Sequence, residues 1–363
     1  MSDQQEKLVR GLKPWKILLP IGLGLAVVIY MFWKEFDAKA FSSLIFTIST
    51  LGWLGLAIFM MLWRDAGYLI RLRVLSEGKL SWAKILRIVF LWEFASSVTP
   101  SAVGGTTVAV IFIHKEGLSV GRSTAIVMAT SFLDELFFIL MFPALVLLVN
   151  AQELFMIEPG DSLWTNNFLY FALVGYSIKI GWMVFMGYGL FINPHFVKRV
   201  VVFIFRLKFL RKWKSGAIKA GNDIVMASSD LKKKPIGFWL KAFFATALSW
   251  IGRYWVFNFL LLALLVSSPG SIGDGLLSFS DHIMVFSKQL VMWIMMLVSP
   301  TPGASGFAEW IFAEFLGSFI PVAGLIGAMA LSWRLITYYP YLIIGILILP
   351  KWINRVFTKK TNL

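Results

Sequence analysis

Long apolar stretches, separated by short polar segments, dominate this sequence. A helix of about 20 apolar residues is long enough to cross the hydrocarbon core of a bilayer. Full spans are therefore predicted at 17–33, 44–63, 122–150, 167–192, 236–267 and 321–349. Two further apolar stretches, 82–116 and 282–319, carry proline and glycine in their middles. The pattern predicts an all-α polytopic membrane protein, a single transmembrane domain over residues 1–363, with six full spans and two broken helical segments.

The distribution of Lys and Arg predicts the side of the membrane on which each loop lies, because these residues concentrate in cytoplasmic loops. Basic residues precede the first span, follow the second and follow the last. The 151–166 and 268–281 loops carry acidic residues without Lys or Arg, so they are predicted outside. Both termini are then cytoplasmic, and the cytoplasmic (inner) membrane is the expected location. These assignments agree if 82–116 is a re-entrant hairpin from the cytoplasm and 282–319 a re-entrant hairpin from outside.

The two breaks resemble each other in sequence. They read SSVTPSAVGG (96–105) and LVSPTPGASG (297–306), each with Thr-Pro followed by small residues and glycine. Broken helices in opposite orientations are typical of transporters whose substrate site lies near the middle of the bilayer. A half-helix that starts after such a break presents its N-terminal N–H groups, a suitable site for a phosphate. We predict these N-termini at Gly104–Thr107 and Ser305–Phe307; two ordinary kinked spans are the alternative.

Residues of the two breaks are therefore candidates for contact with a substrate. They are Thr99, Pro100, Gly104, Gly105, Thr301, Pro302, Gly303 and Gly306.

Charged residues inside apolar spans are costly to bury and are usually paired or functional. Arg253 in SWIGRYWVF and Arg334 in LSWRLITYY lie between aromatic residues in the middle of spans. We predict that both bind an anionic headgroup, with a structural ion pair as the alternative, and that Arg334→Gln abolishes transport without affecting folding. Asp134, Glu135 and Glu309 are candidates for ion coupling or for binding a cationic part of the headgroup. A structural partner is expected for at least one of the adjacent Asp134 and Glu135, and capping of a helix is the alternative for Glu309.

The polar segment 193–235 is strongly basic, with Asp223 and Asp230 as its acidic residues. Apolar residues and cations alternate at near-helical spacing over 196–213, which is typical of an amphipathic helix on a membrane surface. We predict that the basic 196–234 segment contacts anionic lipids of the inner leaflet. A simple positive-inside bias without lipid recognition is the alternative.

Composition excludes several other classes of protein. Hydrophobic residues make up 58% of the chain and charged residues 15%, against about 25% charged in soluble proteins. The net charge of +15 is explained by cytoplasmic loops, so nucleic acid is not expected as a partner. The sequence contains no Cys, and its three His residues are far apart. No metal site, no cofactor and no catalytic residue is predicted, and there is no Walker loop for ATP.

Three motifs resemble one known family. TPSAVGG in the first broken segment, SFLDELFF in the following helix and TPGASGFAE in the second broken segment are similar to motifs of the lysylphosphatidylglycerol synthetase transmembrane-region family, also described as flippase-like integral membrane proteins. The resemblance covers about residues 10–350. The family's late motif usually reads Thr-Pro-Gly-Gly-apolar-Gly-x-x-Glu. Here Ala304 replaces its second glycine and Ser305 its apolar residue, while the matching residues are Thr301, Pro302, Gly303, Gly306 and Glu309. Pro100, Gly104 and Gly105 match the early motif, and Asp134 or Glu135 matches the acidic position after it.

The resemblance implies that this chain handles lipids. In two-domain members the membrane part moves a lysyl-lipid between leaflets and a soluble C-terminal domain synthesises it. We expect a stand-alone member without that synthetase domain, and leave open a separate lipid-modifying enzyme as partner. The leading hypothesis is a flippase for an anionic or zwitterionic phosphate-containing lipid: a phospholipid, an aminoacyl-phospholipid or a polyprenyl phosphate. The alternatives are a small-molecule or ion transporter and a membrane-embedded polyprenyl-phosphate-dependent transferase.

Overall fold

The computed structural model describes residues 38–99, 101–157, 167–204, 214–268, 277–296, 301, 304 and 306–358. Every regular element within these ranges is a helix. In chain order they are α3 (Ala38–Ser42), α4 (Ile48–Leu75), α5 (Trp82–Val98), α6 (Ser101–Lys115), α7 (Val120–Leu148), α8 (Ala151–Leu154), α9 (Asn167–Gly187), the π-helix η2 (Tyr188–Ile192), α10 (Pro194–Ile204), α11 (Lys214–Lys232), α12 (Ile236–Ser267), α13 (Phe279–Met296), α14 (Phe307–Leu316), the 3-10 turns η4 (Gly317–Phe319) and η5 (Ala323–Leu325), α15 (Ile326–Thr337) and α16 (Tyr339–Thr358).

Five helical stretches in the described part of the chain are long and apolar enough to cross a membrane. They are Ile48–Leu75, Val120–Leu148, Phe168–Ile192, Ile236–Ser267 and Ala323–Val356. Each overlaps a predicted span, and the remaining predicted span, 17–33, lies outside the described residues. The chain is thus an all-α polytopic membrane protein, as predicted. The number of six full spans stays a prediction.

The second span extends beyond its predicted end at residue 63. Helix α4 begins at a capping box in which the Thr50 N–H donates to Oγ1 of Thr47. The helix continues to Leu75. It ends there because Glu77 and Gly78, which follow closely, take positive φ angles that a right-handed helix does not allow. Arg64 and Arg71, assigned to a cytoplasmic loop by the sequence, are therefore helical, and both are buried.

The last span is interrupted at Tyr338, between α15 and α16. The hydroxyl of Tyr338 donates to the carbonyl oxygen of Ser97 near the end of α5. The interruption of the last span thus packs against the first broken segment.

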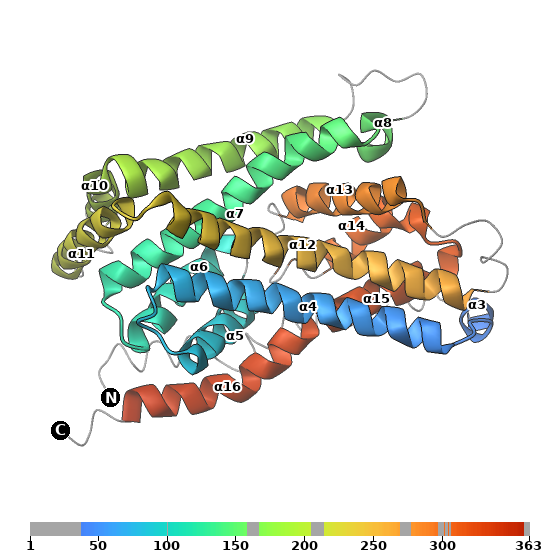
Figure 1. Ribbon diagram of the computed structural model, residues 1–363, viewed down its shortest axis with the longest axis horizontal. Helices are drawn as coiled ribbons and strands as arrows, with labels where there is room; N and C mark the ends of the chain where they lie inside the picture. Colours follow the sequence, from blue (N-terminus) through green and yellow to red (C-terminus); the bar gives the residue numbers. More distant parts are fainter. Residues whose placement is uncertain are drawn as a thin grey trace.

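The two broken segments form two pairs of packed helices, α5 with α6 and α13 with α14. Figure 1 shows the first pair in one half of the bundle and the second pair in the opposite half. The Nζ of Lys84, at the start of α5, donates to the carbonyl oxygen of Glu116, just after α6, at 2.7 Å. The open ends of α5 and α6 therefore lie together, as in a hairpin. Its re-entrant position in a membrane, and that of 282–319, stay predictions.

Helices α4 and α12 pack side by side along the long axis of the bundle (Figure 1). A Cβ on Gly67 would lie 2.6 Å from the carbonyl oxygen of Ala245, and one on Gly252 would lie 2.9 Å from that of Met60. Small residues permit this close approach of two backbones within a membrane. The pair forms the wall on which Arg64, Arg71 and Arg253 are placed.

The basic 193–235 segment contains α10 and α11, which pack against each other, and α11 also packs against α7. Residues 205–213, which include the end of the predicted amphipathic stretch, lie outside the described residues. Helix α10 has a strong apolar face: Val197 is buried, whereas His195 and Arg199 are exposed. Contact with lipid headgroups along 196–234 stays a prediction.

Candidate functional site

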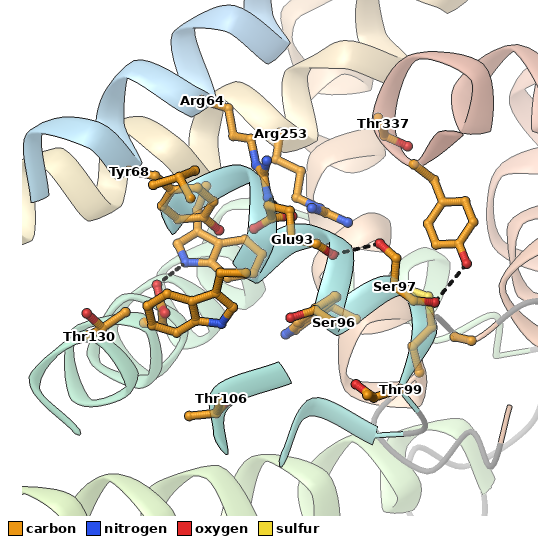
Figure 2. A pocket seen from close by; sticks show the side chains of 18 of the residues that line it. Arg64, Tyr68, Glu93, Ser96, Ser97, Thr99, Thr106, Thr130, Arg253 and Thr337 are labelled. Carbon is orange, nitrogen blue, oxygen red and sulfur yellow. Dashed lines mark hydrogen bonds and ion pairs between the residues drawn. The ribbon is translucent and has the colours of Figure 1, made fainter. Parts of the chain in front are cut away.

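A cavity of about 270 Å³ lies where the two broken segments meet. Residues of α4, α5, α6, α7, α12, α13 and α15 line it, together with Tyr338 and the second break. Its polar lining residues are Arg64, Arg71, Glu93, Ser96, Ser97, Thr99, Thr106, Thr130, Ser131, Asp134, Arg253, Thr301, Arg334 and Thr337. Figure 2 shows Arg64 and Arg253 reaching from α4 and α12 into this space, with Glu93 below them.

Arg64 is the most deeply buried cation of the cavity, with 1% of its side chain exposed. One Nη atom lies 2.9 Å from Oδ1 of Asp65 and the other 2.6 Å from Oε2 of Glu93. The hydroxyl of Tyr341 donates to Asp65 and fixes that carboxylate in the wall. The guanidinium also lies over the rings of Tyr68 and Tyr341. Arg64 is thus compensated twice, by an acid in the wall and by an acid in the cavity.

Arg71 forms the second charged group of the cavity, two turns further along α4. Its Nη1 lies 2.5 Å from Oδ1 of Asp134 and also donates to the hydroxyl of Thr246. The indole N–H of Trp250 donates to the same oxygen of Asp134 at 2.8 Å. Asp134, one of the predicted acids, is therefore a cavity residue held by two donors.

Arg334 reaches the cavity from α15 and is paired behind it with Glu309. Its Nε lies 2.8 Å from Oε1 of Glu309, and the two side chains are 5% and 1% exposed. Oε2 of Glu309 accepts the backbone N–H of Gly306 at 2.7 Å, which caps α14. The structural ion pair of Arg334 and the helix cap by Glu309, which are the alternatives to a site role, are thus present. They contradict the expectation that Arg334→Gln leaves folding intact, because that substitution leaves Glu309 buried without its countercharge.

One Nη of Arg334 is buried and has no hydrogen-bond partner among the described residues. Arg253 differs from the other three arginines of the cavity in having no ion-pair partner among the described residues. Within the described part of the chain its guanidinium has neither a carboxylate nor a hydrogen-bond partner, and it lies over the indole ring of Trp293 at 5.6 Å. Arg253 is the cavity cation best placed to bind an incoming anion.

The predicted break residues divide into four groups. Thr99 and Thr301 line the cavity, as does Ala304, whose φ of 54° lies in the left-handed region. Gly306 takes a φ of 85° and is the N-cap residue of α14. Pro100, Pro302 and Gly303 lie outside the described residues.

Gly104 and Gly105 lie inside α6, which begins at Ser101 rather than at the predicted Gly104. A Cβ on Gly105 would lie 2.8 Å from Cα of Ser96, so this glycine permits close packing of α6 on α5. Gly105 is not among the residues that line the cavity, and its contact with a headgroup stays a prediction. Glu135 is also away from the cavity, because its carboxylate pairs with Lys179 at 2.7 Å. It is the expected structural member of the adjacent acid pair.

The family profile described as the lysylphosphatidylglycerol synthase TM region matches residues 17–345. This match spans both broken segments and every element that lines the cavity. The chain belongs to this family. A UPF0104 membrane protein from Archaeoglobus fulgidus is 25% identical to it over 307 residues, which cover 79% of this chain and 81% of the relative.

Arg64 and Arg71 line the cavity but were not predicted as site residues from the sequence. A signal was present, because Arg64, Tyr68 and Arg71 are spaced at i, i+4 and i+7, which places them on one helical face. Glu93 lies in the first broken segment, and no role was predicted for it.

Among the described residues no group of three or more His, Asp or Glu is placed to hold a metal ion.

Proposed function

We propose that this protein moves a lipid with a negatively charged phosphate headgroup from one leaflet of its membrane to the other. The observation that carries the proposal is the position of Arg253. It is a cation without a carboxylate partner in the described structure, and it lines a cavity inside a bundle of membrane-spanning helices. Arg253 is half-buried, and a cation inside a membrane bundle is costly unless it is paired, so such a site favours an anion that pairs with it.

Two further features support a lipid phosphate rather than an unspecified anion. Both breaks contribute to the cavity, and polar side chains such as those of Thr99, Thr130 and Thr337 line it. The family to which the chain belongs is named after a lipid synthase. Membership in that family favours lipid over a small soluble substrate, which would enter the same cavity from water.

The residues then have distinct roles. Arg253 and the unpartnered Nη of Arg334 bind the phosphate, and Arg64 and Arg71 hold the two cavity carboxylates in place. Glu93 and Asp134 face the same space, so they accommodate the amino group of a zwitterionic headgroup. The hydrocarbon tails stay in the bilayer outside the cavity, since about 270 Å³ accommodates a headgroup and not a whole lipid.

The experiment is a translocation assay in proteoliposomes with phosphatidylglycerol carrying a fluorescent label on one acyl chain. Dithionite bleaches label in the outer leaflet, so translocation increases the fraction that is bleached. The wild-type protein is expected to increase it and Arg253→Gln to abolish the increase. Lys241→Gln is the matched control, because Lys241 is an exposed cation on the same helix. Wild-type bleaching equal to protein-free vesicles, or full activity of Arg253→Gln, contradicts the proposal.

A further inference from the structure

The formal charges of the described cavity cancel. Four arginines line it, and the carboxylates that pair with three of them are also four in number. The arginines are Arg64, Arg71, Arg253 and Arg334, and the carboxylates are Asp65, Glu93, Asp134 and Glu309. A phosphate that binds at Arg253 adds a negative charge to a site that is already neutral. Such an excess charge is costly inside a membrane unless a cation enters with it.

A proton is the smallest cation able to restore the balance, and a carboxylate that faces the cavity can accept it. Asp65 and Glu309 do not line the cavity. Asp65 is held by Arg64 and Tyr341, and Glu309 by Arg334 and the N–H of Gly306. Glu93 and Asp134 are the remaining acids.

These two acids differ in what their protonation leaves behind. Oδ1 of Asp134 accepts hydrogen bonds from Arg71 and from Trp250, and Arg71 has no other carboxylate within ion-pair distance among the described residues. Neutral Asp134 therefore leaves Arg71 without a carboxylate partner. Glu93 has Arg64 as its ion-pair partner, and Arg64 keeps Asp65 when Glu93 is neutral. Protonation of Glu93 thus removes one negative charge without leaving a buried arginine unpaired.

The surroundings of Glu93 are consistent with this choice. From α4 and α16 the nearest charged or titratable side chains are Arg64, Asp65, Tyr68 and Tyr341. Other charged or titratable side chains line the same cavity from the helices around it. They are Arg71 (α4), Asp134 (α7), Arg253 (α12), Arg334 (α15) and Tyr338, between α15 and α16. The side chain of Glu93 is 21% exposed, so water can deliver the proton.

From this arrangement we infer that Glu93 takes up a proton when a phosphate headgroup without an amino group binds, so that lipid and proton move together. The inference rests on the proposed function. The proton comes from water on the side where the lipid enters, forms an O–H bond with the carboxylate of Glu93, and returns to water when the headgroup leaves. A proton gradient across the membrane can then drive the lipid in the direction in which protons flow.

Proton uptake on binding tests the inference directly. Purified protein in weakly buffered detergent solution is titrated with short-chain phosphatidylglycerol, and a pH indicator reports protons taken up while calorimetry reports binding. Farnesyl phosphate is titrated in parallel, so that the two arms distinguish a phospholipid source of the phosphate from a polyprenyl source. We expect uptake of about one proton per bound phosphatidylglycerol and a wild-type affinity that falls about tenfold per unit rise in pH.

Glu93→Gln, which resembles the protonated acid, is expected to bind without proton uptake and with an affinity independent of pH. Glu314→Gln removes an exposed acid from α14 and is expected to behave as the wild type. If Glu93→Gln does not fold, Glu93→Asp keeps a titratable carboxylate and must still take up the proton.

Each other result has a defined meaning. Binding to the wild type without proton uptake, or with an affinity that does not change with pH, overturns the inference and leaves the proposed function intact. Uptake that persists in Glu93→Gln and disappears in Asp134→Asn overturns the assignment to Glu93. Failure of both lipids to bind overturns the proposed function, and the inference falls with it.

Discussion

Replacing Glu309 with Gln removes the negative charge from the most deeply buried ion pair of the site. Oε1 of Glu309 lies 2.8 Å from Nε of Arg334, with exposed fractions of 1% and 5%. Gln keeps an oxygen that can still accept the N–H of Gly306, so the cap of α14 survives. Arg334 does not regain a countercharge, because its other contacts among the described residues are the rings of Trp333 and Tyr338.

The magnitude follows from the uncompensated cation. Removing one partner of a buried pair costs about 3–5 kcal/mol, and loss of a cap about 1 kcal/mol. Since the cap is kept, we expect Glu309→Gln to lower the free energy of unfolding by about 3–5 kcal/mol. Arg334→Gln is expected to cost a similar amount. The double variant is expected to cost clearly less than the sum, because neither charge is then left alone.

Unfolding of the protein in mixed micelles by increasing SDS, followed by tryptophan fluorescence, measures these differences. Glu314→Gln on the same helix is the control and is expected to lie within about 0.5 kcal/mol of the wild type. A Glu309→Gln variant as stable as this control refutes the reasoning. So does a double variant whose cost equals the sum of the single variants, since the two residues are then not coupled.

Two further predictions concern the frame around the site. Gly67→Ala is expected to cost about 1–3 kcal/mol in the same unfolding assay, because the new Cβ meets backbone of α12; Gly55→Ala on α4, where a Cβ meets nothing within 4 Å, is not expected to destabilise, and equal costs contradict the packing. On the loop after α4, partial burial opposes ionisation of Glu77, but hydrogen bonds from Lys234 and Arg122 outweigh it and lower its pKa. The stability that ionised Glu77 contributes is present above its unfolded pKa of about 4.3 and is lost as pH falls through the lower folded pKa. The difference in thermal midpoint between the wild type and Glu77→Gln is therefore expected to shrink on acidification, and a difference that grows refutes this account.

Much of the fold could be predicted from the sequence because membrane spans depend on local composition. The stretch 236–267 is apolar throughout, and the helix found there is Ile236–Ser267. The two broken segments were also evident, since Thr-Pro and glycine interrupt otherwise apolar runs. Helix ends were less predictable. Arg64 ended the second predicted span because a charge beside apolar residues is typical of a loop, whereas α4 continues to Leu75.

The charges of the site could not be assigned from the sequence, because their partners lie far away along the chain. Arg71 meets Asp134 across a separation of 63 residues. Arg64 meets Glu93 from another helix, and this contact turns an apparent loop residue into part of the cavity wall. By contrast, the exceptional position of Arg253 was predictable, because it lies in the middle of a long apolar run with no acid nearby in sequence.

The measurement that tests the central claim most directly identifies what the cavity holds. Native mass spectrometry of protein gently extracted from its own membrane, with fragmentation of bound lipids, gives their identity and stoichiometry. The account predicts a stoichiometric phosphate-bearing lipid that is retained in Lys241→Gln and lost in Arg253→Gln. Protein without lipid, or lipids in the proportions of the bulk membrane that are indifferent to Arg253, would contradict it.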